Sequence, residues 1–175
     1  AYIHDACEAE DGRILLLADS DNTLSESQLF FLTQEGELNH QECLMVDHGA
    51  LCAIKGGIAV IGRHTLEDSG DRRLMLIQLH FENESINETI FRYEAERGVA
   101  LLEKDGVLWG MAEEKKQAGN RVIATFNIID EEEISIKGAQ TWAMSDTDLT
   151  GLGVVPYNGT MAFIGFCPAD INNHD

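Results

Sequence analysis

The 175-residue chain is 44% hydrophobic and carries 31 acidic against 12 basic residues, which gives a formal charge of -19. That composition favours a domain with a packed core, and the negative charge disfavours direct binding to a nucleic-acid backbone. No apolar run approaches the roughly 20 residues of a membrane-spanning helix, and the acidic N-terminal segment lacks the features of a signal peptide. We therefore expect a folded domain with protein partners, with no nucleic-acid or membrane contact.

Short apolar runs alternate with polar turns along the whole chain, and the pattern recurs. The first unit reads EDGRILLLADSDNTLSESQLFFLTQEGELNHQECL, the second begins with GGIAVIGRHTLEDSGDRRLMLIQL, the third with KDGVLWGMAEEKKQAGNRVIATFNII, and a shorter fourth with YNGTMAFIGF. Each unit opens with a turn glycine, and these are Gly12, Gly57, Gly106 and Gly159, separated by 45, 49 and 53 residues. Spacings of this size are typical of propeller blades.

Each unit predicts several hairpin-linked strands. The second apolar runs QLFFLTQ, RRLMLIQLHF and NRVIATFNII show little polar alternation, which indicates strands covered on both faces. The segment before each turn glycine supplies one more strand, and alternating EEEISIKG has the pattern of an outer strand. Four strands per unit is the blade count of a propeller.

On this strand pattern and these glycines the chain resembles β-propeller repeat families with kelch-like or WD-repeat-like blades. The second glycine of a unit is present as Gly62, Gly110 and Gly165, although no Trp-Asp dipeptide closes a unit. The resemblance implies an all-β fold built from four-stranded blades. Residues 1–175 would form a single repeat domain of about three and a half blades, with approximate boundaries 1–47, 48–96, 97–138 and a partial 139–175.

Two structural alternatives stay open. A β-sandwich of about a dozen strands has similarly regular hairpins. A local helix is also compatible with residues 86–97, INETIFRYEAER, because Ile86, Ile90 and Tyr93 would share one face.

An open stack of blades exposes an apolar face at each end. A chain of about three and a half blades therefore needs other protein to cover these two faces. The chain is then a piece of a larger propeller, or pairs with a second copy into a seven-bladed ring, or receives blades from another protein. We therefore expect a protein partner or self-association that completes the propeller.

The sequence shows no catalytic motif. No H-E-x-x-H, G-x-S-x-G or phosphate-binding glycine loop is present, and the acidic segments 146–151 and 19–24 are interpreted as solvated turns rather than calcium loops. His48 follows Asp47, but no nucleophile is tied to that pair. We expect no catalytic residue, no cofactor and no metal.

The residues that suggest partner binding are large or basic side chains in otherwise polar loops of an acidic chain. They are Trp142, Arg63, Arg72, Arg73 and His48. The leading hypothesis is a non-catalytic propeller scaffold or complex subunit that mediates protein–protein interaction. The alternatives are a hydrolase whose carboxylates line a central channel, and an acidic inhibitor that mimics nucleic acid.

The four cysteines, at positions 7, 43, 52 and 167, lack metal-binding spacing and are predicted to be reduced thiols. This favours a cytoplasmic or nuclear protein. Three Asn-x-Ser/Thr triplets, beginning at Asn83, Asn87 and Asn158, keep a secreted protein as the alternative.

Overall fold

The fold is all-β, as predicted. The structure is a computed structural model that describes residues 2–19, 26–115, 121–128, 137–142, 150–158 and 160–166. The described residues form fourteen strands in four antiparallel sheets. They contain no helix with the length and apolar character needed to cross a membrane. The segment 86–97, for which a helix was open, contributes to a strand instead.

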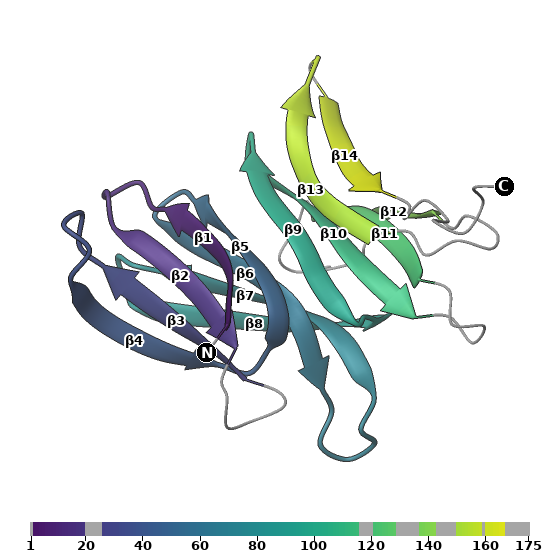
Figure 1. Ribbon diagram of the computed structural model, residues 1–175, viewed down its shortest axis with the longest axis horizontal. Helices are drawn as coiled ribbons and strands as arrows, with labels where there is room; N and C mark the ends of the chain where they lie inside the picture. The colour runs from purple at the N-terminus through teal and green to yellow at the C-terminus, as the bar shows by residue number, and fades with distance from the viewer. Residues whose placement is uncertain are drawn as a thin grey trace, which may run out of the picture.

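In each sheet the neighbours in space are also neighbours in sequence (Figure 1). Sheet 1 consists of β1 (Tyr2–Glu8), β2 (Ile14–Asp19), β3 (Ser27–Leu32) and β4 (Leu38–Leu44). Sheet 2 consists of β5 (Asp47–Ile54), β6 (Gly57–Thr65), β7 (Arg72–His80) and β8 (Ser85–Glu94). Sheet 3 consists of β9 (Arg97–Lys104), β10 (Val107–Lys115), β11 (Arg121–Ile128) and β12 (Lys137–Trp142). Sheet 4 consists of β13 (Thr150–Tyr157) and β14 (Thr160–Phe166).

The turn glycines of sheets 1, 2 and 3 mark equivalent points, with one shift from the predicted alignment, and the fourth predicted turn glycine, Gly159, lies outside the described residues. Gly12, Gly56 and Gly106 all have positive φ, between 69° and 82°, in the turn that follows the first strand of their sheets. Gly56, rather than Gly57, is therefore the turn glycine of sheet 2. Gly57 pairs with Ile54 and begins β6, and a Cβ added there would lie 2.0 Å from the carbonyl oxygen of Leu79.

Every first strand contains a β-bulge near its start, where one extra residue interrupts the pairing with the second strand. The interruptions lie between Ile3 and Asp5, between Asp47 and Ala50, between Gly98 and Ala100, and between Gly151 and Gly153. Because the irregularity recurs at the same place in four sheets, the units repeat in backbone geometry as well as in sequence.

The sheets are stacked face to face, and their first strands lie side by side. Strand β5 contacts β1 on one side and β9 on the other, and β9 also contacts β13 (Figure 1). Sheet 2 thereby has a hydrophobic core on each face, one shared with sheet 1 and one shared with sheet 3. In β6 and β7, residues 57–62 and 74–79 are all buried. The prediction of a continuously apolar strand covered on both faces is confirmed for β7.

Among the described residues, sheet 1 is covered on one face only. The same prediction is wrong for β3, which alternates strictly between buried and half-buried residues, with Leu29 and Phe31 facing the core shared with sheet 2. The opposite side, here called the outer face of sheet 1, carries four half-buried apolar side chains in cross-strand pairs. These are Leu16 opposite Phe30 and Ile14 opposite Leu32.

Sheet 4 ends the stack in a comparable way. Val154 and Met161 are buried, whereas Val155, Tyr157 and Ile164 are exposed. Both ends of the described stack therefore present apolar side chains, as an open stack is expected to do.

Candidate functional site

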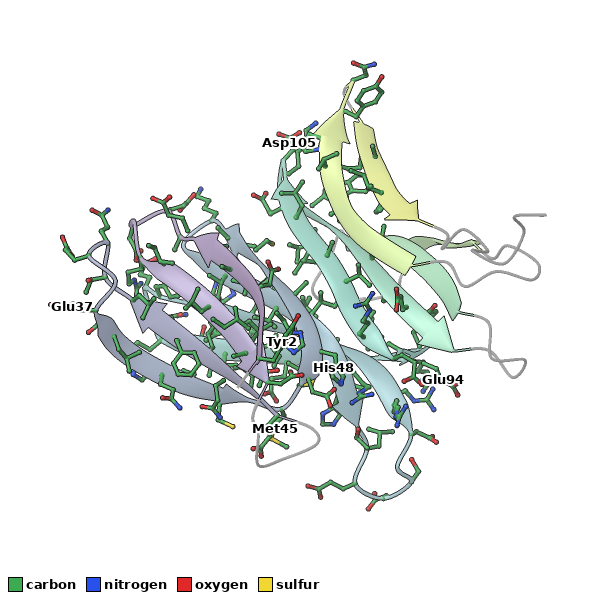
Figure 2. The ribbon with its side chains drawn as sticks, in the orientation of Figure 1. Tyr2, Glu37, Met45, His48, Glu94 and Asp105 are labelled. Atoms are coloured by element: carbon green, nitrogen blue, oxygen red, sulfur yellow. The ribbon has the colours of Figure 1, made fainter. Side chains whose placement is uncertain are left out.

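One end of the stack gathers the residues that the sequence suggested for partner binding. The first strands begin there, the second strands end there, and the bulges lie just inside (Figure 1). We call this end the bulge-end surface and define it by Tyr2, Met45, His48, His64 and Arg72. Tyr2, Met45 and His48 lie close together at this end in Figure 2.

Arg63 lies at this end but is committed to a structural ion pair. Its Nε and a terminal nitrogen donate hydrogen bonds of 2.7 and 2.5 Å to the carboxylate of Asp47, opposite it on β5. The side chains are only 13% and 5% exposed. The hydrogen bonds to Asp47 raise the pKa of Arg63 although burial opposes the charge. Arg63 thus holds the start of sheet 2 together and is poorly placed to meet a partner.

Sheet 3 contains the same pair with the charges exchanged. Arg97, at the start of β9, donates two 2.8 Å hydrogen bonds to Glu113 on β10. The Glu113 side chain is 2% exposed. A bidentate guanidinium–carboxylate pair therefore closes the bulge end of both sheets.

The other two predicted arginines lie at the β6–β7 end of sheet 2. Arg72 donates hydrogen bonds of 2.6 and 2.9 Å to Glu96, and Arg73 donates one of 3.1 Å to Asp71. Arg72 is half-exposed, so its guanidinium still faces solvent. Of the three arginines, Arg72 is the most accessible to a partner.

His48 lies on β5, not in a loop, and has a φ of 46° within the bulge. A non-glycine residue rarely adopts this conformation, so the position is strained. Its ring Nδ1 lies 3.1 Å from Oδ2 of Asp19, whereas Asp47 is paired with Arg63. The adjacent acid Asp47 is therefore not the partner of His48.

Trp142 is the last residue of β12 and pairs with Ile123, so it belongs to sheet 3 and not to a loop between units. Ile123 in turn pairs with Glu113. The backbone of Trp142 thus lies at the bulge end of sheet 3, past the boundary expected at residue 138.

The exposed apolar residues of the bulge-end surface escaped prediction. Tyr2 is 73% exposed and Met45 is 39% exposed. Tyr2 makes an edge contact with the His4 ring, which makes another with His48, and His64 Nδ1 lies 2.7 Å from the carbonyl oxygen of Met45. Aromatic, Met and Arg side chains are enriched in protein interfaces. Each of these apolar residues stands alone among polar residues in the sequence, so the sequence did not predict that they lie together.

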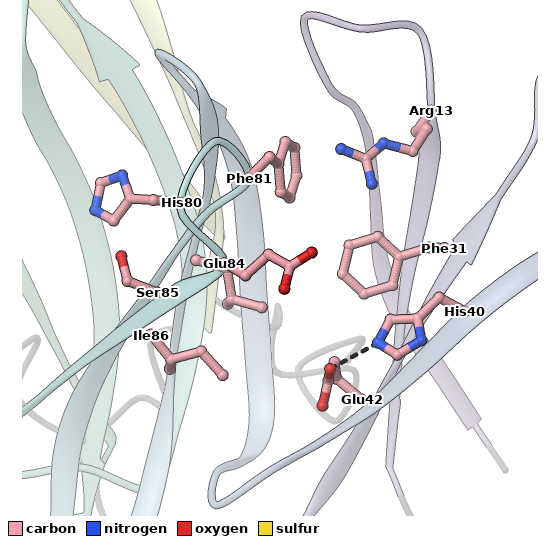
Figure 3. Close-up of a pocket in the computed structure, with 10 residues that line it drawn as sticks. Arg13, Phe31, His40, Glu42, His80, Phe81, Glu84, Ser85 and Ile86 are labelled. Atoms are coloured by element: carbon pink, nitrogen blue, oxygen red, sulfur yellow. Dashed lines mark hydrogen bonds and ion pairs between the residues drawn. The ribbon is translucent and has the colours of Figure 1, made fainter.

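A pocket of about 460 Å³ opens between sheets 1 and 2 at the opposite end (Figure 3). The guanidinium of Arg13 lies 4.1 Å from the ring centre of Phe81 and is bound by Asp11. Hydrogen bonding to Arg13 lowers the pKa of Asp11. His40 pairs with Glu42 at 2.6 Å on the same wall, which sheet 1 forms, and Phe81 lies on the wall from sheet 2. Because the guanidinium of Arg13 is already paired with Asp11, the pocket suits a neutral or cationic ligand better than an anion.

Comparison with known proteins gives no assignment. No protein-family model matches the chain, and no curated protein matches it significantly. Function must therefore be inferred from the geometry and charge of the described residues.

Proposed function

We propose that the chain is a run of β-propeller blades and serves as a non-catalytic protein-binding scaffold or complex subunit. The support is the regular stack of sheets, in which neighbouring first strands lie side by side and each contains the same bulge, and in which a turn glycine follows the first strand of sheets 1, 2 and 3. A sandwich of two layers would not place one four-stranded sheet between two others, as sheet 2 is placed here.

The observation that carries the proposal is the outer face of sheet 1. Ile14, Leu16, Phe30 and Leu32 have the apolar character of an inter-blade face but are only half-buried. Covering each of them contributes about 1 kcal/mol to association. We propose that protein covers this face, through self-association that completes the propeller, and that the bulge-end surface is then free for a second partner.

Static light scattering on the purified chain tests this proposal. We expect the mass of two chains, because a second copy would cover the outer face. Leu16→Glu and Phe30→Glu should each convert the assembly to single chains, since a carboxylate would be buried without a partner. A wild-type chain that remains a well-behaved monomer over a wide concentration range contradicts the proposal and favours the sandwich.

The matched control is Ile90→Glu. Ile90 is an exposed apolar residue on β8, 46% accessible, and lies away from the outer face of sheet 1. This variant introduces the same charge yet should retain the mass of the wild type. If Ile90→Glu dissociates the assembly as readily as Leu16→Glu, the outer face is not the contact.

A further inference from the structure

Two histidines and one carboxylate from three different strands meet between sheets 1 and 2. His4 is the bulge residue of β1, Asp19 ends β2, and His48 lies in the bulge of β5. Nε2 of His4 lies 2.5 Å from Oδ2 of Asp19, and Nδ1 of His48 lies 3.1 Å from the same oxygen. Both imidazoles therefore converge on a single oxygen atom, and the bulges that reorient the strands bring them there.

The His4 nitrogen is not satisfied by this arrangement. Nε2 of His4 is buried and makes no hydrogen bond, although it lies 2.5 Å from Oδ2 of Asp19. A buried nitrogen without a hydrogen bond is costly and suggests a missing partner.

The carboxylate itself is held in place from behind. Its other oxygen, Oδ1, accepts hydrogen bonds from the backbone N–H of His48 at 3.1 Å and from Oγ of Ser27 at 3.2 Å. Ser27 is fully buried. These bonds direct Oδ2 towards the histidines, in the way that supporting hydrogen bonds orient metal ligands.

The corresponding positions of the other sheets show what Asp19 lacks. Arg63 and Glu113 occupy the same place on the second strands of sheets 2 and 3, and each is closed by a bidentate ion pair with its first strand. In sheet 1 the residue opposite Asp19 is Tyr2, which supplies no charge. Within the described residues, the basic side chains paired with Asp19 within 4 Å are those of His4 and His48, and Arg63 interacts with Asp19 electrostatically without a direct ion pair.

We propose that His4, Asp19 and His48 bind a divalent transition-metal ion of the zinc class. The ligand atoms would be Nε2 of His4, Oδ2 of Asp19 and Nδ1 of His48, which all lie within 4.8 Å of one another. Two imidazoles and one carboxylate are donors that zinc accepts, and its ligand atoms stand about 3 to 3.5 Å apart in a tetrahedron. Small ring movements meet that requirement.

The proposed site is open to solvent on the side of His48, and a bound ion would connect two sheets. His48 is 43% exposed, so solvent or a ligand from a partner can complete the tetrahedron next to Tyr2. The ion would also bridge the sheets, because His4 and Asp19 belong to sheet 1 and His48 to sheet 2. The bound ion would therefore connect sheets 1 and 2 at the bulge-end surface. This proposal does not depend on which protein covers the outer face of sheet 1.

The test is calorimetric titration of the untagged chain with Zn²⁺ in the presence of excess Mg²⁺, which occupies weak carboxylate sites. We expect one ion per chain, and Co²⁺ in place of Zn²⁺ should give the visible absorption of a tetrahedral site. His4→Gln and His48→Gln should each weaken binding by at least about 100-fold, and Ser27→Ala by about 10-fold. Circular dichroism spectra of the variants, recorded without metal, check that they fold.

His40→Gln is the matched control, because His40 also lies 2.6 Å from a carboxylate, that of Glu42, but has no third ligand among the described residues. It should bind zinc like the wild type. A second measurement needs no variant: zinc should protect His4 and His48, but not His40, from diethylpyrocarbonate. The absence of stoichiometric binding, retention of binding in both glutamine variants, or equal modification of all three histidines overturns the proposal.

Discussion

Arg63 and Asp47 close the bulge end of sheet 2 with two parallel hydrogen bonds between the second and first strands. The pair is nearly excluded from solvent, and Asp47 is the partner that compensates Arg63 at hydrogen-bond distance, with Glu96 farther away at 3.7 Å. The equivalent pair in sheet 3 is Arg97 with Glu113, in which the acid and the base have changed strands. The geometry of the site tolerates either orientation.

Removing one member of the pair should be costly, and exchanging the two should restore much of the loss. We expect Asp47→Ala to lower the free energy of unfolding by about 3 to 5 kcal/mol, because Arg63 is left buried without its partner. The double variant Asp47→Arg with Arg63→Glu reproduces the order seen in sheet 3 and should recover more than half of that loss. Urea unfolding of both variants measures the difference.

Recovery in that experiment should be incomplete. Glu96 lies 3.7 Å from Arg63 and would face an acid after the exchange. A double variant no more stable than Asp47→Ala would show that the two orientations are not interchangeable.

Gly57 should be intolerant of a side chain. A Cβ would lie 2.0 Å from the carbonyl oxygen of Leu79 on the neighbouring strand, and backbone atoms cannot move aside cheaply. We expect Gly57→Ala to cost at least about 3 kcal/mol in thermal or urea unfolding. Gly153→Ala is the control, because nothing lies within 4 Å of its added Cβ, and it should stay within about 0.5 kcal/mol of the wild type.

The cysteines should differ in reactivity. Burial raises the pKa of Cys7 and of Cys52 to about 12, whereas Cys43 is exposed, with its pKa raised less strongly. At pH 8 the thiolate fraction of the first two is then about 1 in 10,000. Iodoacetamide should therefore modify Cys43 well before Cys7 and Cys52, as peptide mass spectrometry would show. Equal labelling of all three in the folded chain would mean that sheet 2 is not packed against sheet 1 at Cys7 and against sheet 3 at Cys52.

The same burial makes stability depend on alkaline pH. The Cys52 thiol has a folded-state pKa raised from 9.0 to about 12, so its contribution is complete below pH 9 and is lost as the pH rises towards 12. We expect the free energy of unfolding to fall by up to about 1.4 kcal/mol for each pH unit in that range. Cys52→Ala should have a flatter profile, and an unchanged difference between the two proteins from pH 8 to pH 11 would refute this origin.

Much of the secondary structure could be predicted because hydrophobic runs and turn residues act locally. The all-β fold, the apolar β7 and the positions of most hairpins follow from that pattern. The prediction places the turn glycine of sheet 2 one residue too late, at Gly57 instead of Gly56. The two glycines are adjacent, and only the positive φ of Gly56 and the close strand neighbours of Gly57 show which one forms the turn. The segment at β8 was ambiguous because its Glu and Ala residues favour helix, and pairing with β7 overrides that preference.

The clustered side chains could not be predicted because they depend on packing between sheets. His4, Asp19 and His48 are far apart in sequence, and a bulge decides the direction of each histidine. Proximity in sequence favoured Asp47 as the partner of His48, yet Asp47 bonds to Arg63. The arginines were predicted as binding residues from their charge, and the carboxylates that pair with Arg63 and Arg72, which are distant in sequence, become visible only in three dimensions.

The exchanged charges of sheets 2 and 3 also bear on how a repetitive chain finds its correct partners. Chains with similar units risk inserting a strand of one unit into the next. If β9 took the place of β5 beside β6, Arg97 would stand against Arg63, and β5 beside β10 would set Asp47 against Glu113. Like charges facing each other would destabilise both misassembled forms. The two ion pairs therefore favour the correct pairing of first and second strands in these adjacent, otherwise similar sheets during folding.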